Sequence, residues 1–154
     1  VWWLMNSSGK VVEQTTNSAA KTYTQVLGVT LEQPVPGEMG VATEEVSTQT
    51  DESGETVQLT LTGAQQLSAA LEILQALEDN DIVGQAASVN VTRLNDIILW
   101  YGTQYQVNLG ENVNIPYKIA CMNDVILQLS DYQTGILDVS FTNWKEQVGF
   151  TPFD

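Results

Sequence analysis

Acidic side chains are the most abundant groups in this sequence that could carry out chemistry. The 154 residues include 19 Asp and Glu, 5 Lys and Arg, one cysteine and no histidine. Paired carboxyl groups can cleave a glycosidic bond as acid and base without histidine, and Asp96 and Asp138 are examples of such a pair. In so acidic a chain, however, pairs arise by chance, and carboxylates in strands or turns ordinarily serve solvation. We therefore expect a domain that is not an enzyme and has no catalytic residues.

The lack of histidine removes several common kinds of site. Histidine is the most frequent metal ligand and the most frequent general base near neutral pH, and Ser-His and Cys-His nucleophiles require it. Cys121 is the single cysteine, so the sequence predicts neither a disulfide framework nor a structural zinc site. The acidic residues 51–55 lack the ligand spacing of an EF-hand loop. We expect no metal and no cofactor.

The charge and the aromatic content of the chain limit the classes of ligand that it can bind. A formal net charge of −14 opposes nucleic acid, because affinity for nucleic acid comes largely from Lys and Arg that neutralise phosphates. Trp2, Trp3, Trp100 and Trp144, together with the tyrosines, could form a stacking platform for cell-wall glycan. Strand aromatics more often belong to the core or to cross-strand pairs. A glycan-binding module therefore stays open as an alternative, which an exposed coplanar aromatic row would favour.

Two segments have the periodicity of amphipathic helices. Residues 63–80 carry apolar side chains at steps of three and four, and so do residues 117–130, where Pro116 stands just ahead of the helix. Each helix has one apolar face to bury. The side chains that we expect to be buried against strand residues such as Val107, Leu109, Leu137 and Val139 are Leu67, Leu71, Leu74, Ile119, Val125 and Ile126.

The remaining elements are predicted to be strands. Residues 1–13 form a hairpin around a Ser/Gly turn, residues 22–31 form a short strand interrupted by Gly28, and Gly102 begins the turn of a second hairpin. The other expected strands span residues 86–92, 96–101, 105–109, 136–141 and 146–151, and the last two form a hairpin.

This order of elements predicts one α+β domain over residues 1–154, with a mainly antiparallel sheet and two helices packed on one face. Residues 38–56 contain six acidic side chains and no basic one, amid Thr, Ser and Gly. Such a segment can bury little apolar surface. We expect it to be a solvated, mobile excursion from the domain.

An ordered set of short motifs runs along most of the chain. Its members are residues 4–11 (Leu-Met-Asn-Ser-Ser-Gly-Lys-Val), 26–28 (Val-Leu-Gly), 89–96 (Val-Asn-Val-Thr-Arg-Leu-Asn-Asp), 105–110 (Tyr-Gln-Val-Asn-Leu-Gly) with Lys118 eight residues later, 135–141 (Gly-Ile-Leu-Asp-Val-Ser-Phe) and 148–152 (Val-Gly-Phe-Thr-Pro). Together with the order of elements, this set resembles the β-domain of the bacterial cell-division protein FtsQ, called DivIB in Gram-positive bacteria.

The resemblance implies a non-catalytic scaffold of the divisome that acts during septum formation. Family members carry a transmembrane helix and a POTRA domain ahead of the β-domain, so we expect this sequence to be a fragment of a single-pass protein of the bacterial cytoplasmic membrane, with this domain on the extracytoplasmic side. The implied partners are small coiled-coil division proteins of the FtsB/DivIC and FtsL types. The resemblance further implies contact with septal peptidoglycan synthases.

The resemblance also implies where these partners bind. In the family, an extended partner segment adds a strand to the edge formed by the final strands, so that backbone hydrogen bonds provide affinity and alternate side chains provide specificity. Phe141 and Phe150 match aromatic positions used in partner contact, and Arg93 lies about one residue from a basic contact position. Phe141 shares strand parity with Leu137 and Val139, so it could equally be a core residue. The expected partner-binding residues are Arg93, Phe141, Thr142, Asn143, Trp144, Val148, Gly149, Phe150 and Thr151.

Overall fold

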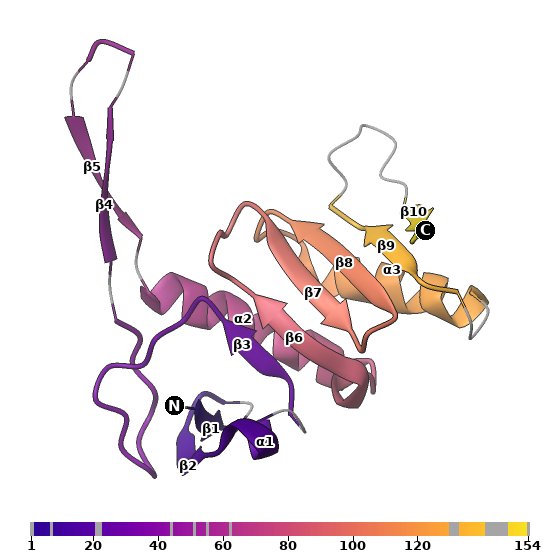
Figure 1. Cartoon of the computed structure of the whole chain (residues 1–154), viewed down its shortest axis with the longest axis horizontal. Coiled ribbons are helices and arrows are strands. Elements are labelled where there is room, and N and C mark those ends of the chain that lie inside the picture. Colours follow the sequence, from indigo (N-terminus) through magenta and orange to yellow (C-terminus); the bar gives the residue numbers. More distant parts are fainter. Residues whose placement is uncertain are drawn as a thin grey trace.

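The structure is a computed structural model that describes residues 2–6, 8–20, 23–43, 45–50, 52–54, 56–61, 63–129, 133–140 and 148–153. These residues form an α+β domain, which confirms the predicted fold class, with a six-stranded sheet, two separate hairpins and two long helices (Figure 1). In spatial order the sheet consists of β10 (Gly149–Pro152), β9 (Gly135–Asp138), β8 (Tyr105–Gly110), β7 (Ile97–Tyr101), β6 (Ala86–Asn90) and β3 (Gln25–Leu27).

The sheet is mixed rather than uniformly antiparallel. β10–β9, β8–β7 and β7–β6 are antiparallel pairs, whereas β9–β8 and β6–β3 are parallel pairs. Antiparallel pairs are thus the majority, in agreement with the predicted mainly antiparallel sheet, and the two parallel pairs were not predicted. Both of them join strands that are separated in the chain by a helix, and such crossover connections produce parallel neighbours.

The two crossovers explain why both helices lie on one face of the sheet. α2 (Gly63–Asp79) lies between β3 and β6 in the chain, and α3 (Ile115–Gln128) lies between β8 and β9. The four flanking strands run in the same direction, and both connections step toward β10. Connections of the same hand and direction place their helices on the same face. Figure 1 shows both helices behind the sheet, as predicted.

The core lies between this sheet face and the helices. Val89, Leu99, Val107 and Leu137 occupy one row of register partners across β6, β7, β8 and β9, and each is fully buried. On α3, Ile119 is fully buried as predicted. Alternating positions on neighbouring strands thus supply the sheet side of the core, and the helices supply the other side.

The buried face of α2 differs from the predicted leucine stripe. Its buried residues include three alanines and Ile73, which allow a close approach to the rest of the core. Leu67 and Leu71 are only half-buried and line a hollow that β3 also lines, so the prediction was wrong for them. The helix therefore has two apolar faces, and its periodicity did not reveal which of them meets the sheet. The other predicted residues, which are half-buried and pack against the core, are Leu74, Val125 and Ile126.

The N-terminal hairpin forms as predicted. β1 (Trp2–Met5) pairs antiparallel with β2 (Val11–Thr15), and Asn6 closes the turn by accepting hydrogen bonds from the backbone N–H groups of Ser8 and Lys10 (3.1 and 2.9 Å). A short helix, α1 (Asn17–Ala20), follows. The six-stranded sheet does not include this hairpin, which packs as a separate small layer (Figure 1).

The acidic segment 38–56 contains more backbone pairing than its composition indicated. Met39 forms a bridge with Lys10, and Ala42, which is buried, forms one with Leu31. The chain then forms a hairpin of β4 (Glu45–Thr50) and β5 (Thr56–Leu61), which projects away from the sheet (Figure 1). The alternation of Val, Leu and Leu with polar residues in β5 was the signal that could have predicted it. The mobility of the segment remains a prediction.

The first strand of the final hairpin ends earlier than expected. β9 ends at Asp138, whose carboxylate accepts hydrogen bonds from the backbone N–H and hydroxyl of Ser140 (2.9 and 2.5 Å) and bends the chain out of the strand. β10 spans Gly149–Pro152, and residues 146 and 147 of the expected strand lie outside the described residues. Residues 141–147, which include the predicted Phe141, lie outside the described residues.

Candidate functional site

The predicted partner-binding strand lies at an edge of the sheet. β10 pairs with β9 on one side, and no strand within the described part of the chain pairs with its other side. The opposite edge is β3, which has only three residues and pairs in parallel with β6. β10 is therefore the antiparallel edge of this sheet. It carries the predicted site residues Gly149, Phe150 and Thr151, and Val148 directly precedes it.

Backbone hydrogen bonds show which residues of β9 bond to β8 and which bond to β10. Gly135 donates its backbone N–H to the carbonyl of Gln104 (3.1 Å), at the start of β8. Val139 donates its N–H to the carbonyl of Asn108 in β8 (3.0 Å). Because backbone groups of successive strand residues point to opposite sides, the odd-numbered residues of β9 bond to β8 and the even-numbered ones bond to β10.

The same alternation orients the backbone of β10. Phe153, just after the strand, donates its N–H to the carbonyl of Thr134 (3.0 Å). Two positions earlier, Thr151 lies opposite Ile136, so its backbone groups also point toward β9. The N–H and carbonyl groups of Phe150 consequently point away from the sheet, where a further strand would pair.

Proline and glycine shape the two ends of this edge. Pro152 occupies an outward-facing position, and its missing N–H leaves the edge with one donor fewer. Val148 is the outward-facing residue before the strand, and its side chain is half-buried. Gly149 has room for a side chain, since an added Cβ would lie 3.7 Å from the Cβ of Asp138. The free edge is thus short. Pro152 also limits nonspecific pairing of this edge with exposed strands of other proteins.

The Phe150 side chain lies on the helix-covered side of the sheet. Its register partner is Leu137, which is fully buried, and its ring meets the Tyr105 ring edge-on at 6.3 Å between centroids and 73° between planes. It also covers Gly135, where an added Cβ would lie 2.8 Å from the ring. Phe150 is half-buried, so it stabilises the β9–β10 hairpin and still presents part of its ring to solvent.

The other predicted residues are placed as follows. Thr151 is exposed on β10. Arg93 is exposed in the loop between β6 and β7, which β8 and β9 separate from β10 in the sheet. Three strand spacings correspond to about 14 Å, so Arg93 does not join the edge directly. The remaining predicted residues, Phe141, Thr142, Asn143 and Trp144, lie outside the described residues.

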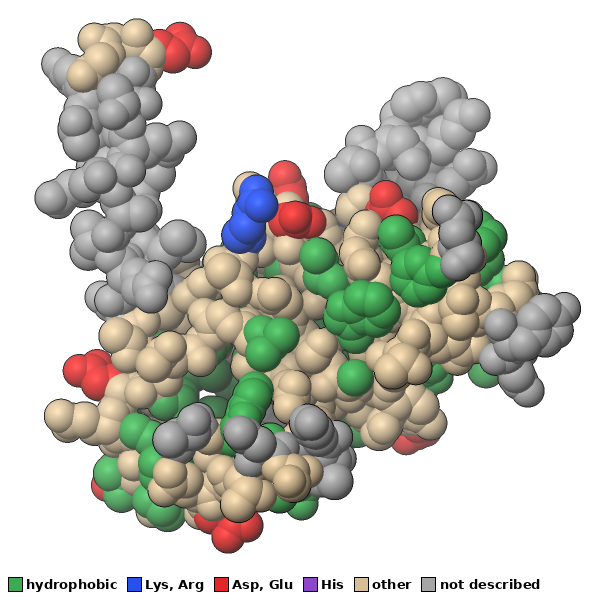
Figure 2. Space-filling model, viewed as in Figure 1, with side chains coloured by type: hydrophobic (Ala, Val, Ile, Leu, Met, Phe, Trp, Pro, Cys, Tyr) green, Lys and Arg blue, Asp and Glu red, His purple; other side chains and the backbone are tan. Residues whose placement is uncertain are grey.

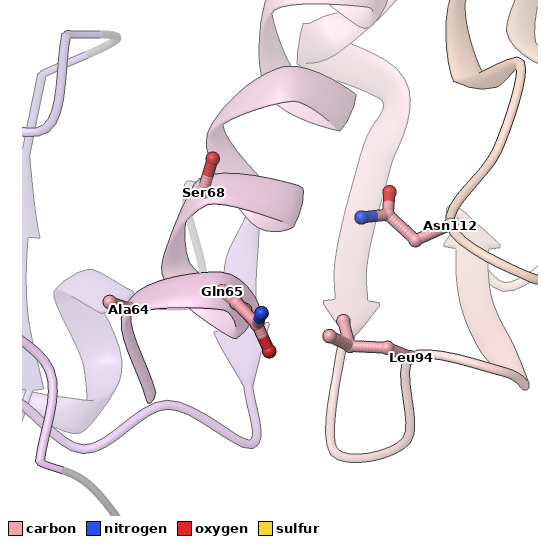
Figure 3. A pocket seen from close by; sticks show the side chains of 5 residues that line it. All are labelled: Ala64, Gln65, Ser68, Leu94 and Asn112. Carbon is pink, nitrogen blue, oxygen red and sulfur yellow. The ribbon is translucent and has the colours of Figure 1, made fainter. Parts of the chain in front are cut away.

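A second hollow, of about 440 Å³, lies near Arg93, between α2 and two loops (Figure 3). Ala64, Gln65 and Ser68 of α2 line one side, and Leu94 and Asn112 line the other (Figure 3). Asn112 donates its backbone N–H to the carbonyl of Leu94 (2.9 Å), which ties the two loops together. The side-chain oxygen of Asn112 is buried and has no hydrogen-bond partner among the described residues.

Lys118 is a buried charged residue to which the sequence analysis gave no role. Only 2% of its surface is exposed, and its Nζ donates hydrogen bonds to the carbonyl oxygens of Leu109 (2.8 Å) and Glu111 (2.9 Å). Burial lowers the pKa of Lys118, and the nearby charge of Glu111 partly opposes this effect. The lysine thereby ties the end of β8 to the first turn of α3.

The described residues show no arrangement typical of a metal site or of a membrane span. No three His, Cys, Asp or Glu side chains among them lie together where a metal could bind. No helix in the same residues is both long and apolar enough to cross a membrane. Asp96 and Asp138 are both exposed, β8 lies between their strands, and the Asp138 carboxylate is engaged with Ser140.

Comparisons with models of protein families, with curated proteins and with solved structures yield no match.

Proposed function

We propose that this domain is a non-catalytic scaffold of the FtsQ/DivIB type, which binds an extended segment of an FtsB/DivIC-type or FtsL-type division protein along β10. The partner segment would pair antiparallel with β10 or continue the sheet in parallel, and it would extend the six strands to seven. In the cell the domain would act on the extracytoplasmic side of the cytoplasmic membrane during septation.

The outward-facing backbone of β10 is the observation that carries this proposal. Val148 and Phe150 offer a pairing surface at the sheet edge, and the half-buried ring of Phe150 gives that surface an apolar anchor. Buried aromatic anchors surrounded by weaker contacts are typical of residues that dominate binding energy. The resemblance in sequence motifs supports the identity of the partner, and the edge geometry supports the mode of binding.

The proposal is tested with proline at two positions of the same edge. Val148→Pro removes an outward N–H, so it should weaken binding to the extracytoplasmic segments of FtsB/DivIC and FtsL homologues at least tenfold while the domain stays folded. Thr151→Pro is the matched control, because it removes an N–H that points to β9 and should lower the melting temperature instead. Binding is measured by calorimetry and folding by circular dichroism.

Phe150→Ala tests the anchor. We expect it to reduce affinity by about 2 kcal/mol, with Tyr23→Ala, which removes an aromatic exposed at 53% away from β10, as the control. Because the Phe150 ring also covers Gly135, binding is measured well below the melting temperature of the variant. Full-strength binding by folded Val148→Pro and Phe150→Ala proteins would refute the proposed edge.

The non-catalytic part of the proposal has its own test. We expect no sustained hydrolysis of peptidoglycan or of model glycosides, because the chain has no histidine and Asp138 is engaged in a turn. Turnover that disappears in Asp138→Asn would contradict this part while leaving the binding experiment unaffected.

One observation favours a second candidate function, the binding of cell-wall glycan. Trp100 and Phe153 stack on the helix-free face of the sheet, with centroids 6.3 Å apart and planes at 25°, and Phe153 is 39% exposed. Figure 2 shows hydrophobic side chains gathered on this face over β7 to β9. A flat aromatic surface suits a sugar ring. Co-sedimentation with insoluble peptidoglycan that is lost in Trp100→Ala and kept in Val148→Pro would favour this candidate.

A further inference from the structure

A large apolar hollow separates the N-terminal hairpin from the rest of the domain. It encloses about 750 Å³ and lies between β1, β3 and the leucine face of α2. Figure 2 shows the surface hollowed between the hairpin and the body of the molecule, with hydrophobic side chains at its rim. Volumes of about 300 to 1,000 Å³ are typical of pockets for small ligands.

Two sets of apolar side chains face this space without filling it. Trp2 and Trp3 come from β1, and Leu67, Leu71 and Leu74 come from α2. All five are half-buried, in contrast with the fully buried residues on the neighbouring face of α2. Apolar side chains on both sides of an unfilled space provide a surface that gains stability when an apolar molecule displaces water from it.

Two of the polar side chains around the hollow are already engaged. The Thr24 hydroxyl donates to the carbonyl of Val83 or Ala86 (3.1 and 2.8 Å), and the Asn6 side chain closes the turn of the N-terminal hairpin. The exposed lining is mainly apolar, so the binding of a ligand depends chiefly on apolar contact.

The charge at the hollow restricts the head group of the ligand. Glu78, which is exposed, is the one charged side chain among the described residues that line it. Among the described residues of the lining, none is basic and able to pair with a carboxylate or a phosphate, and the net charge of −14 opposes anions in general. A cationic or neutral head group is compatible with Glu78, whereas an anionic one would be repelled by the Glu78 carboxylate.

We propose that this hollow is a binding site for a single alkyl chain with a neutral or cationic head group, such as a long-chain alcohol or amine. The site is separate from the β10 edge and does not depend on the function proposed for it. Each additional methylene in the chain should tighten binding about fourfold until the hollow is full.

Displacement of a fluorescent probe tests the proposal. N-phenyl-1-naphthylamine, an uncharged apolar probe, should gain fluorescence with one equivalent of the protein, and decylamine, decanol and decanoate then compete for it below their micelle concentrations. We expect decylamine to compete best and decanoate at least tenfold worse than decylamine. Failure of the probe to bind at about 100 μM protein, or stronger competition by decanoate, would overturn the proposal.

Two variants locate the binding. Leu74→Trp fills the hollow and should abolish probe binding, whereas Leu127→Trp, the matched control on α3 at a side chain that is 75% exposed, should leave it unchanged. Glu78→Gln lies at the exposed rim, where the fold does not depend on it, and should remove the preference for decylamine over decanol. An unchanged probe affinity in folded Leu74→Trp, or an unchanged preference in Glu78→Gln, would show that the ligand binds elsewhere.

Discussion

At the scale of single residues, Lys118 shows how a charged side chain can serve the fold. Its ammonium group satisfies two carbonyl oxygens where β8 ends and α3 begins, in a place where water has little access. Burial of a charged group raises the free energy of the folded state. Removal of the lysine would also raise it, because the buried carbonyl groups would lose their hydrogen-bond donor. The residue therefore positions the loop that leads from the sheet to the helix.

Lys118→Met should destabilise the domain by about 2 kcal/mol, because the methionine fills similar space but leaves the carbonyls of Leu109 and Glu111 without the lysine as donor. Lys10→Met, at an exposed lysine of the N-terminal hairpin, is the control and should change stability by less than about 0.5 kcal/mol. Urea unfolding measures both. Equal effects of the two substitutions would contradict the structural role of Lys118.

The lowered pKa of Lys118 also predicts a pH dependence. Between its folded-state pKa and 10.5, the folded protein binds fewer protons at this site than the unfolded chain does. This site therefore makes the free energy of unfolding increase as the pH rises through that window. The difference in unfolding free energy between the wild type and Lys118→Met should grow in favour of the wild type over the same range. A difference that falls or stays constant would contradict the assignment.

Two glycines of the final hairpin predict opposite outcomes for the same substitution. A Cβ at Gly135 would lie 2.4 Å from the Thr151 carbonyl oxygen and 2.8 Å from the Phe150 ring, so Gly135→Ala should cost about 1 to 3 kcal/mol. A Cβ at Gly149 would lie 3.7 Å from the Cβ of Asp138, an ordinary contact distance, so Gly149→Ala should change stability by less than about 0.5 kcal/mol. Thermal unfolding of both variants checks this. Equal melting temperatures would mean that Phe150 does not cover Gly135 in solution.

At the scale of elements, the β4–β5 hairpin and the sheet are separate units. The two strands pair with each other, and neither belongs to the six-stranded sheet. By contrast, the preceding segment is attached to the body: Gly40 donates its N–H to the Gly9 carbonyl (2.8 Å), and Thr43 donates to Thr30 (2.7 Å). The acidic region thus contains an anchored part and a projecting part.

Replacement of residues 45–61 by a short Gly-Ser linker should therefore lower stability by less than about 1 kcal/mol, because closure entropy changes slowly with loop length. Deletion of residues 38–43 is the comparison and should cost clearly more, since it removes those hydrogen bonds and the buried Ala42. Chemical unfolding and hydrogen exchange measure both. Strong exchange protection across β4 would contradict the predicted mobility of the projecting part.

At the scale of the whole molecule, the charge of −14 sets the response to salt. Self-repulsion among like charges destabilises the compact state, and dissolved ions screen it beyond about 10 Å at 0.1 M. The melting temperature should rise by several degrees between about 10 and 200 mM NaCl. Sucrose at matched osmolality is the control for effects unrelated to charge. A melting temperature that falls with added salt would indicate that attractive ion pairs outweigh the net repulsion.

The sequence by itself determined the type and approximate place of most elements. Apolar spacing of three and four in α2 and α3, and turn residues such as Gly102, act within a few residues of the chain, so they can be interpreted without the fold. The sequence also indicated the final hairpin, which contains the candidate edge. Its acidic composition disfavours the binding of nucleic acid. The hairpin β4–β5 was missed because its acidic composition outweighed the alternation in β5.

Only the tertiary structure decided which faces and edges these elements present. The parallel pairs β3–β6 and β8–β9, the outward backbone of Phe150, the half-burial of its ring against Tyr105 and the turning of Leu67 and Leu71 toward the apolar hollow were not apparent from any one segment. The physical reason is that each depends on contacts between residues far apart in the chain. Local periodicity specifies that an apolar face must be buried, and the packing of all elements together selects what buries it.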